Sequence, residues 1–341
     1  MNVHQNILEA IGHTPIVKLN RIGNDLIHDF YVKIEAMNPG ASVKDRLALQ
    51  LINDAIDRGD LKEGGTIIET TSGNTGMGIA MIAAVKGFSC IFTVPDKVSD
   101  EKINALRAFG AEVKVCPTAV EPEDPRSYYS VAKKLASEIP NAYFTNQYHN
   151  PSNPKAHYTM TGPEIFEQMG TNIDVLVAGI GTGGTLCGSA KFLKEKNPNM
   201  TTLAVDPIGS VFYEYFHTGN IPKVITGYKV EGVGEDFMPT TIDFDLIDDI
   251  VQVSDQDSFD MTHRLAKEEG IFVGGSCGMA VHGAIEKAKL VDEKKTYLII
   301  LPDSGSRYVS KVFNAQWLDE NGFAGGQMQE QKRAAEKQVQ L

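Results

Sequence analysis

Short apolar segments alternate along this chain with amphipathic segments, and no other feature of the sequence constrains the fold as strongly. The apolar segments predict strands at residues 30–34, 66–69, 89–94, 112–115, 142–144, 175–178, 202–205 and 297–301. The amphipathic segments predict helices at residues 44–58, 76–86, 100–109, 127–138, 162–169, 185–195, 255–269 and 278–288. Strands that alternate with helices are typical of βαβ units around a mostly parallel sheet. The sequence therefore predicts an α/β fold.

The predicted elements fall into two groups along the chain. With 341 residues, the chain is long enough for one large or two moderate domains. Residues 46–146 hold four strands with their helices, and we expect them to form a small mobile domain that closes over the substrate. Residues 1–45 and 147–323 would form the larger, cofactor-binding domain. Residues 324–341 begin with Ala324 and two glycines and are then rich in Gln, Glu and Lys, which is typical of a solvated polar tail.

Charge and hydropathy exclude several classes of protein. The chain has 32 Lys and Arg residues against 44 Asp and Glu residues, a net charge of −12, which argues against binding to nucleic acid or to an anionic membrane. The apolar runs at residues 175–180 and 297–301 are far too short to span a bilayer. The first residues lack the charged and apolar regions of a signal peptide. A cytoplasmic enzyme is the expected class.

The four cysteines, Cys90, Cys116, Cys187 and Cys277, show no CxxC or Cys/His spacing that would indicate a metal site. We expect them to be small, reduced, mostly buried side chains and expect no bound metal.

Lys44 follows the strand at 30–34 and a Pro-Gly turn, and it begins a predicted helix. A lysine that forms an imine must lose its proton, which requires partial desolvation near apolar or cationic groups. Sites in α/β proteins open at the ends of strands, where this lysine lies. For a lone lysine, an ordinary surface position at a helix start would be the better interpretation.

A glycine-rich turn, Gly181-Thr182-Gly183-Gly184-Thr185, joins the strand at 175–178 to a helix. Converging backbone N–H groups and a helix N-terminus suit a phosphate. The turn lacks the Gly-Lys-Ser/Thr of a Walker A loop and the spacing of the dinucleotide fingerprint. Taken alone, the motif fits a phosphate site and a ligand-free tight turn equally well.

Two other polar turns open helices. Thr71-Ser72-Gly73-Asn74-Thr75-Gly76 gathers hydroxyl and N–H groups suited to a small carboxylate, although a simple N-cap explains an isolated segment as well. Asn74 is also a candidate for hydrogen bonding to a phenolate-like oxygen on a ring cofactor. Ser276, in the turn at 274–278, offers a neutral hydroxyl to a pyridine nitrogen. An unprotonated ring is a weaker electron sink and favours elimination of a β-substituent.

The ordered set of segments resembles the fold-type II pyridoxal-phosphate enzymes, specifically the group of cysteine synthase and cystathionine β-synthase. The matching segments are 38–46, 69–76, 147–158, 181–185, 274–278 and 301–304, and the resemblance extends over residues 7–323. It implies two doubly wound αβα subdomains with mostly parallel sheets. It also implies pyridoxal 5′-phosphate as cofactor and small-molecule amino acids and thiols as substrates.

The resemblance assigns a role to each motif. Lys44 would form the covalent link to the cofactor and act as acid and base on the substrate α-proton. Asn74 would hold the cofactor O3′ and Ser276 its pyridine nitrogen. The phosphate would lie on Gly181, Thr182, Gly183, Gly184 and Thr185. The substrate-binding residues would be Thr71, Ser72, Thr75, Gln147, Tyr148 and Gly232, of which Thr71, Ser72, Thr75 and Gln147 take the carboxylate.

Three segments favour the cystathionine β-synthase branch, in the form of a bacterial synthase without a regulatory domain. They are residues 147–150, which include Tyr148, residues 230–237, and residues 301–304 followed by 311–323 with Trp317. We expect neither the C-terminal regulatory pair nor the haem-binding N-terminal extension of longer members, and therefore expect no control by those routes.

The expected reaction condenses L-serine or O-acetylserine with homocysteine to cystathionine through an aminoacrylate, with hydrogen sulfide released when cysteine is the donor. Three alternatives stay open: cysteine synthase acting with sulfide, another pyridoxal-phosphate elimination on the same scaffold, and a non-catalytic binding module. Family members are usually homodimers, and the apolar stretch at 7–19 is a candidate for the interface.

Overall fold

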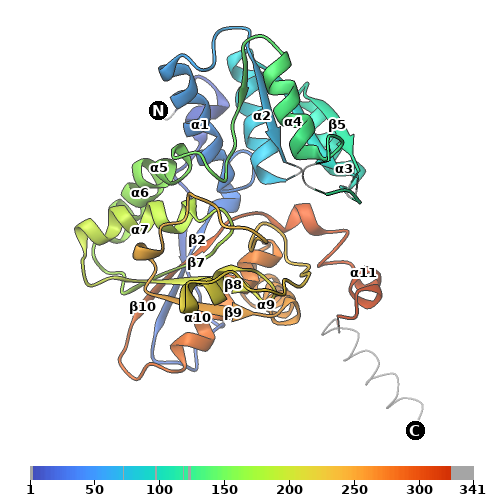
Figure 1. Ribbon diagram of the computed structural model, residues 1–341. Helices are drawn as coiled ribbons and strands as arrows, with labels where there is room; N and C mark the ends of the chain where they lie inside the picture. The colour runs from blue at the N-terminus through green and yellow to red at the C-terminus, as the bar shows by residue number, and fades with distance from the viewer. Residues whose placement is uncertain (1–2, 72, 97, 118, 122–123, 324–341) are drawn as a thin grey trace.

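The computed structural model consists of two α/β units with mostly parallel sheets, one larger and one smaller, which lie one above the other (Figure 1). The structure describes residues 3–71, 73–96, 98–117, 119–121 and 124–323. Ser72, predicted as a substrate ligand, and the predicted tail at 324–341 therefore lie outside the described residues.

The larger sheet has the strand order β1-β2-β10-β7-β8-β9, and only β1 runs antiparallel to its neighbour. Its strands are β1 (Ile16–Lys18), β2 (Asp29–Ile34), β10 (Thr296–Leu301), β7 (Val175–Gly179), β8 (Thr201–Pro207) and β9 (Asp249–Val253). One face packs against α9 (Asp255–Glu269) and α10 (Gly275–Ala288). The other face packs against α6 (Gly162–Met169), α7 (Gly184–Lys196) and α8 (Phe212–Thr218). The unit therefore has three layers, with the sheet in the middle.

The smaller sheet is wholly parallel and has the order β5-β4-β3-β6. Its strands are β5 (Glu112–Cys116), β4 (Ser89–Pro95), β3 (Thr66–Thr70) and β6 (Ala142–Phe144). The main core forms with α1 (Lys44–Arg58), α2 (Asn74–Lys86) and α3 (Asp100–Ala108). A smaller cluster packs α4 (Tyr128–Glu138) on the opposite face.

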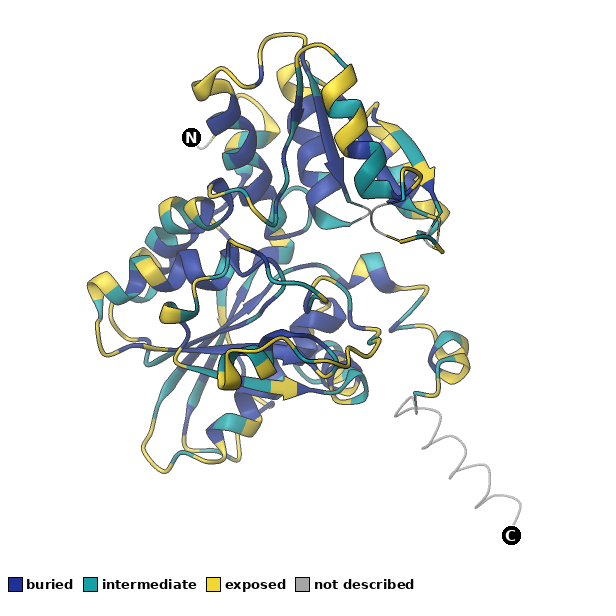
Figure 2. Ribbon diagram, viewed as in Figure 1, coloured by how far each residue is buried: buried dark blue, intermediate teal, exposed yellow. Residues whose placement is uncertain are grey.

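Burial follows this layering (Figure 2). Strand β8 is buried at every position after Thr201, and β4 is buried from Cys90 to Val94. Strands covered by helices on both faces read as continuous apolar runs rather than as alternating ones. This is why the strands were recognisable in the sequence. All four cysteines are buried and unpaired, as the sequence predicts.

The α/β class with mostly parallel sheets is confirmed, but several elements were missed. Strands β1 and β9 are short or interrupted by Lys18, Asp249 and Gln252, so they lack the expected apolar run. The missed helices are α5 (Ser152–Ala156), the π-helix η3 (His157–Thr161), α8 and α11 (Ala315–Glu320). The missed 3₁₀ turns are η1 (Ile7–Ala10), η2 (Glu35–Met37), η4 (Phe244–Leu246) and η5 (Gly305–Tyr308). No helix in the described part of the chain is long and apolar enough to cross a membrane.

Candidate active site

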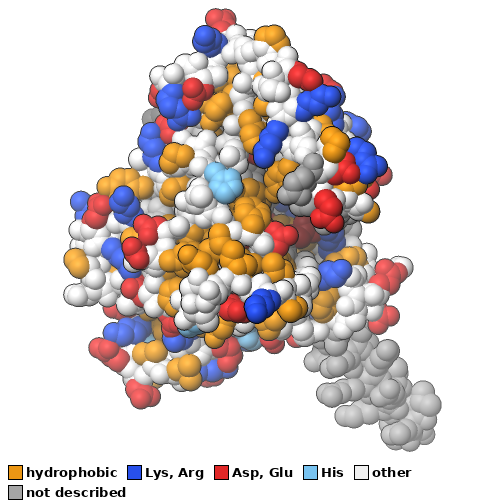
Figure 3. Space-filling model, viewed as in Figure 1, with side chains coloured by type: hydrophobic (Ala, Val, Ile, Leu, Met, Phe, Trp, Pro, Cys, Tyr) orange, Lys and Arg blue, Asp and Glu red, His pale blue; other side chains and the backbone are white. Residues whose placement is uncertain are grey.

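A pocket of about 380 Å³ lies where strand ends of both sheets meet. Strand β3 ends at Thr70 and leads into the turn at Thr71, while β10 ends at Leu301 and leads to Asp303. Strand β7 leads to Gly181. Ligands of open α/β sheets bind outside the carboxyl ends of the strands, so this pocket is in the expected place. On the face shown in Figure 3, apolar side chains gather across the middle of the molecule and the charged ones lie mostly around them.

Lys44 is the first residue of α1 and lines the pocket. The loop before it is fixed to the end of β10: the Val43 N–H donates to the Pro302 carbonyl at 2.8 Å, and the Ser304 N–H donates to the Ala41 carbonyl at 3.2 Å. Burial lowers the pKa of the Lys44 amine, although the carboxylates of Asp303 and Glu235 oppose that shift. The amine is therefore easier to deprotonate than an ordinary lysine, as imine formation requires.

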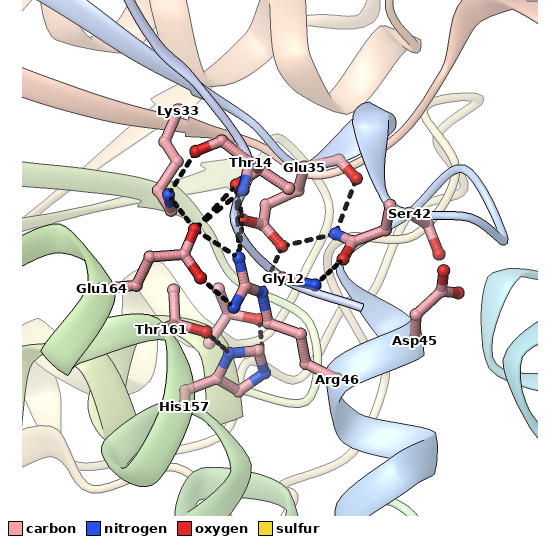
Figure 4. Close-up of polar contacts among 12 residues, drawn as sticks. Gly12, Thr14, Lys33, Glu35, Ser42, Asp45, Arg46, His157, Thr161 and Glu164 are labelled. Carbon is pink, nitrogen blue, oxygen red and sulfur yellow. Dashed lines mark hydrogen bonds and ion pairs between the residues drawn. The ribbon is translucent and has the colours of Figure 1, made fainter. Parts of the chain in front are cut away.

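A buried network of charges anchors the helix that carries Lys44 (Figure 4). The Arg46 guanidinium binds Glu35 through Nε at 2.7 Å and Glu164 through Nη1 at 2.7 Å. Lys33 Nζ binds the other oxygen of Glu164 at 2.7 Å, and the Thr14 hydroxyl donates to Glu35 at 2.7 Å. These residues join the N-terminal segment, β2, the first turn of α1 and α6. The network thus fixes the direction in which Lys44 leaves the helix.

The turn at Gly181–Thr185 opens α7 and faces a second, smaller cavity that adjoins Lys44. Gly181, Thr182, Gly183 and Thr185 line this cavity. The helix has no side-chain cap, so the N–H groups of its first turn are available to an anion. The positive end of a helix next to these groups favours a phosphate.

Two of the glycines in this turn have no tolerable substitute. Gly183 has φ +75°, and a Cβ there would lie 2.3 Å from Cγ1 of Ile242. A Cβ at Gly184 would lie 1.9 Å from Oδ1 of Asn153. Gly184 does not line either cavity, and its role is to let the helix start pack closely.

His157 contacts the last residue of the same turn. Its Nε2 lies 3.2 Å from the Thr185 hydroxyl, and its Nδ1 lies 2.9 Å from the Thr161 hydroxyl. Burial, and then the positive charges of Lys44 and Arg46, hold the pKa of His157 well below its ordinary value. A neutral imidazole donates through one nitrogen and accepts through the other, so it can orient the Thr185 hydroxyl.

The turn after β3 brings the predicted carboxylate ligands into the pocket. Thr71, Asn74 and Thr75 all line it, and the Thr75 hydroxyl donates to Oε1 of Gln147 at 2.7 Å. The Asn74 amide donates to Asp303 at 2.7 Å. The Asn74 Oδ1 atom is buried and has no hydrogen-bond partner among the described residues. A buried polar atom without a partner is costly, so a ligand donor at this position would be stabilising.

The remaining predicted residues reach the pocket from the larger unit. Ser276 is buried in the first turn of α10 and lines the pocket, as do Gln147 and Tyr148. Gly232, with φ +83°, lines both cavities. The structure therefore brings together every predicted site residue that it describes, except that Gly184 lies just behind the surface.

These groups fit pyridoxal phosphate. The turn at 181–185 offers an anion site, Lys44 an amine of lowered pKa, Asn74 an unpaired amide oxygen, and Ser276 a neutral hydroxyl. The four lie around adjoining cavities.

Sequence reasoning missed several residues that line the pocket: Lys102, Tyr128, Tyr129, Tyr228, Glu231, Glu235, Asp303, Arg307 and Tyr308. Asp303 could have been predicted, because it lies two residues after the end of a buried parallel strand. The buried Asp303 carboxylate accepts hydrogen bonds from Asn74 at 2.7 Å and from the Tyr308 hydroxyl at 2.5 Å. Tyr128 and Tyr129 were harder to predict as site residues, because the sequence shows only an aromatic pair at the end of a polar run.

A family model, curated relatives and solved structures that resemble this chain all indicate the same enzyme family. The family model described as "Pyridoxal-phosphate dependent enzyme" matches residues 7–303. Cystathionine β-synthase of Dictyostelium discoideum is 44% identical over 94% of this chain, and the match spans 64% of that protein, less than two thirds of its length. A cysteine synthase of Staphylococcus aureus is 42% identical over 89% of this chain and 95% of its own length. The crystal structure of O-acetylserine-dependent cystathionine β-synthase from Helicobacter pylori superposes with a TM-score of 0.82, at 38% identity, over 91% of this chain and 99% of that one.

Proposed function

The chain belongs to the pyridoxal-phosphate-dependent enzymes, and on that premise we propose that it catalyses β-replacement, joining L-serine or O-acetylserine to the sulfur of homocysteine to give cystathionine. The proposal extends to hydrogen sulfide release when cysteine is the donor. Relatives that carry the names cystathionine β-synthase and cysteine synthase both support replacement at the β-carbon as the reaction class.

Bound pyridoxal phosphate supplies an electron sink that lets the α-proton and then the β-substituent leave. In our proposal Lys44 Nζ takes the α-proton and later returns it, which suits an amine whose pKa is lowered by burial. Thr71 and Thr75, around the start of α2, and Gln147, after β6, bind the donor carboxylate through hydroxyl and amide groups. Ser276 would hold the ring nitrogen, and its neutral hydroxyl would not protonate it.

Closure of the unit at residues 46–146 would exclude water from this site. Three contacts join the two sides of the pocket in the structure: Asn74 with Asp303, Thr75 with Gln147, and Lys102 with Glu231. Each is made by side chains, so each can form and break as the units move. We infer that they hold the closed state.

The observation that carries the choice of acceptor is the lining of the pocket beyond the donor site. Tyr128, Tyr129, Tyr148 and Tyr228 line the pocket and lie near Glu235. We assign this group of side chains to the acceptor. A second amino acid needs such a polar, aromatic space, whereas sulfide does not. Cysteine synthase activity with sulfide is the second candidate, and the match over nearly the whole Staphylococcus aureus cysteine synthase favours it.

A matrix of substrates tests the proposal. The purified enzyme is assayed with serine or O-acetylserine as donor and with homocysteine or sulfide as acceptor, and products are identified by mass spectrometry. We expect kcat/KM for homocysteine to exceed that for sulfide by at least about tenfold, a difference of ~1.4 kcal/mol. Preference for sulfide would instead identify a cysteine synthase, and no turnover with any pair would exclude β-replacement.

We also propose a cytoplasmic homodimer. Ile7 and Val17 are exposed in the N-terminal stretch, which supports an interface there. Light scattering of the purified protein measures its mass directly, and a monomer at micromolar concentration would contradict the proposal.

A further inference from the structure

Three carboxylates line the pocket, and Glu235 differs from the other two in its partners. Glu231 binds Lys102 at 2.5 Å and Lys311 at 2.5 Å. Asp303 accepts hydrogen bonds from Asn74 and Tyr308. Glu235 is hydrogen-bonded to the Tyr148 hydroxyl, and within the described part of the chain it forms no ion pair. Asp303 also forms no ion pair among the described residues, but it is buried and holds two hydrogen bonds, whereas Glu235 is only partly buried. Glu235 is therefore the better placed of the two to accept a cationic partner.

The backbone holds Glu235 in a fixed position. Its N–H donates to the Ser210 hydroxyl at 3.2 Å, and its carbonyl accepts from the Val211 N–H at 3.1 Å. The preceding residue, Gly234, has φ +70° and donates its N–H to the Ile180 carbonyl at 2.7 Å. The side chain is thus presented to the pocket by a segment bonded to the larger unit on both sides.

The electrostatic surroundings compensate this carboxylate only in part, because the positive charge of Lys44 opposes the rise in its pKa from a distance. Burial raises the pKa of Glu235 to about 7, the hydrogen bond from Tyr148 opposes the rise, and the charge of Asp236 adds to it. The titratable and charged groups that face it are Lys44, Tyr128, Tyr129, Tyr148, Tyr228 and Asp236. Lys44 is the cation among them, and it forms no ion pair with Glu235 within the described residues. A ligand with a positive charge would stabilise the ionised form.

We propose that Glu235 determines acceptor specificity by binding the α-ammonium group of an amino-acid thiol, and that its negative charge disfavours hydrosulfide. This inference rests on the proposed β-replacement function and names the acceptor class of the same site. Homocysteine and cysteine carry an ammonium group, whereas hydrosulfide is an anion. One carboxylate therefore attracts the first class and repels the second. Tyr148 holds the Glu235 carboxylate toward the acceptor.

Equilibrium binding tests the contact without relying on turnover. Cystathionine is compared with an analogue whose homocysteine-derived half lacks the amino group, by calorimetry on the cofactor-loaded enzyme. In the wild type, cystathionine should bind about tenfold or more tightly than the analogue, as expected for one charge-assisted hydrogen bond. In Glu235→Gln, which keeps the side-chain volume and both backbone bonds, this difference should disappear. If it persists, Glu235 does not bind the ammonium group.

Kinetics then separate recognition from a general loss of function. Glu235→Gln should raise KM for homocysteine about tenfold with little change in kcat, while mercaptobutyrate, which is homocysteine without its amino group, should be unaffected. Activity with sulfide should stay the same or increase. Glu235→Asp, which keeps the charge, should restore part of the homocysteine affinity. Equal losses with all three acceptors would overturn the proposal.

Asp236→Asn is the matched control, because Asp236 is exposed and lies outside the pocket lining. It removes the same formal charge but keeps the Glu235 carboxylate. Because the charge of Asp236 raises the pKa of Glu235, the substitution should preserve the preference for homocysteine or strengthen it slightly. The two proposals fail in different ways. If no serine donor is consumed, the proposed function fails. If homocysteine is used but the Glu235→Gln enzyme discriminates as the wild type does, only this inference fails.

Discussion

The two sides of the pocket are built by different means. On the side of the larger sheet, the anion site consists of backbone N–H groups at the start of α7, and its shape is set by Gly183 and Gly184. On the side of the smaller sheet, Thr71, Asn74 and Thr75 offer side chains from a turn and a helix start. The backbone N–H groups of the anion site cannot move apart unless the helix start unfolds. The side chains on the other side of the pocket can move away from their partners while the fold stays intact.

Lys44 lies between the two sides but belongs mechanically to the larger one. Its helix contributes to the core of the smaller unit, yet Arg46 ties the first turn to Glu35 and Glu164. The preceding loop is bonded to the end of β10. The comparison therefore predicts a rigid cofactor side that includes Lys44 and a substrate side that moves against it.

Replacing Lys44 should have the largest effect. Lys44→Ala removes the proposed covalent link and the acid–base group, so turnover should fall by about 10²- to 10⁴-fold or more. The visible absorbance of the lysine-linked cofactor should also be lost, while cofactor held through its phosphate should remain detectable after gel filtration. Lys62→Ala, at an exposed lysine, is the control. Retained absorbance with normal turnover would contradict the assignment.

Replacing Glu164 should disrupt the charge network that holds the first turn of α1 against the larger unit. Glu164→Gln leaves the Arg46 and Lys33 cations partly uncompensated in a buried site and should lower the free energy of unfolding by about 3–5 kcal/mol, measured by urea denaturation. Glu268→Gln, in an exposed pair with Arg264 on α9, should cost less than about 1 kcal/mol. Similar costs at the two sites would show that the network does not anchor α1.

The same network predicts an acid dependence. Burial disfavours the charged form of Glu164, but the hydrogen bonds and charges of Arg46 and Lys33 outweigh burial and hold its pKa at about 2, below its ordinary value of 4.5. A carboxylate with a lowered pKa stabilises the fold above its ordinary pKa, and this contribution is lost as the pH falls. Wild-type stability should thus decrease between about pH 5 and pH 2. Glu164→Gln should show a flatter profile over that range.

Gly183→Ala tests whether the anion site depends on backbone geometry. The substitution combines a positive φ with a contact of 2.3 Å to Ile242, so we expect a loss of about 2–4 kcal/mol in stability. Cofactor affinity, measured by titrating the apoenzyme, should fall more than tenfold if the N–H groups are displaced, about 1.4 kcal/mol or more. Gly219→Ala also has a positive φ but meets nothing within 4 Å, and it should cost about 1–2 kcal/mol without affecting the cofactor.

The contrast between the two sides also explains which residues the sequence could predict. The turn at Gly181–Thr185 was recognisable because glycines and a following helix leave a local signature. Lys44 and Ser276 were found for the same reason, since each lies at the start of a helix after a turn. Buried parallel strands were equally visible, because helices cover both of their faces.

The rest of the site depends on contacts between residues far apart in the chain. Asp303 meets Asn74 across 229 positions, and Lys102 meets Glu231 across 129. No local pattern encodes such pairs. Glu235 follows a glycine in a segment without regular secondary structure, and only the folded chain shows that it has no ion pair among the residues the structure describes. Strand β9 escaped detection because Asp249 and Gln252 interrupt its apolar pattern.

The smallest predicted effect concerns the contact between the two sides at Lys102. Its ammonium binds Glu231 at 2.5 Å and lies 5.7 Å from the centre of the Tyr308 ring, and the two charged side chains are partly exposed. Lys102→Gln should therefore change stability by no more than about 1 kcal/mol.

Because Lys102 comes from α3 and its two partners come from the larger unit, the variant should mainly favour the open state. We expect KM for the donor to rise a few-fold, and the same rise should appear in the wild type as salt screens the pair. Lys114→Gln, which breaks an exposed pair with Glu112 inside the smaller unit, should change neither value. If both variants behave alike, Lys102 adds only surface charge, and the mobile side must be held closed by Asn74, Thr75 and their partners.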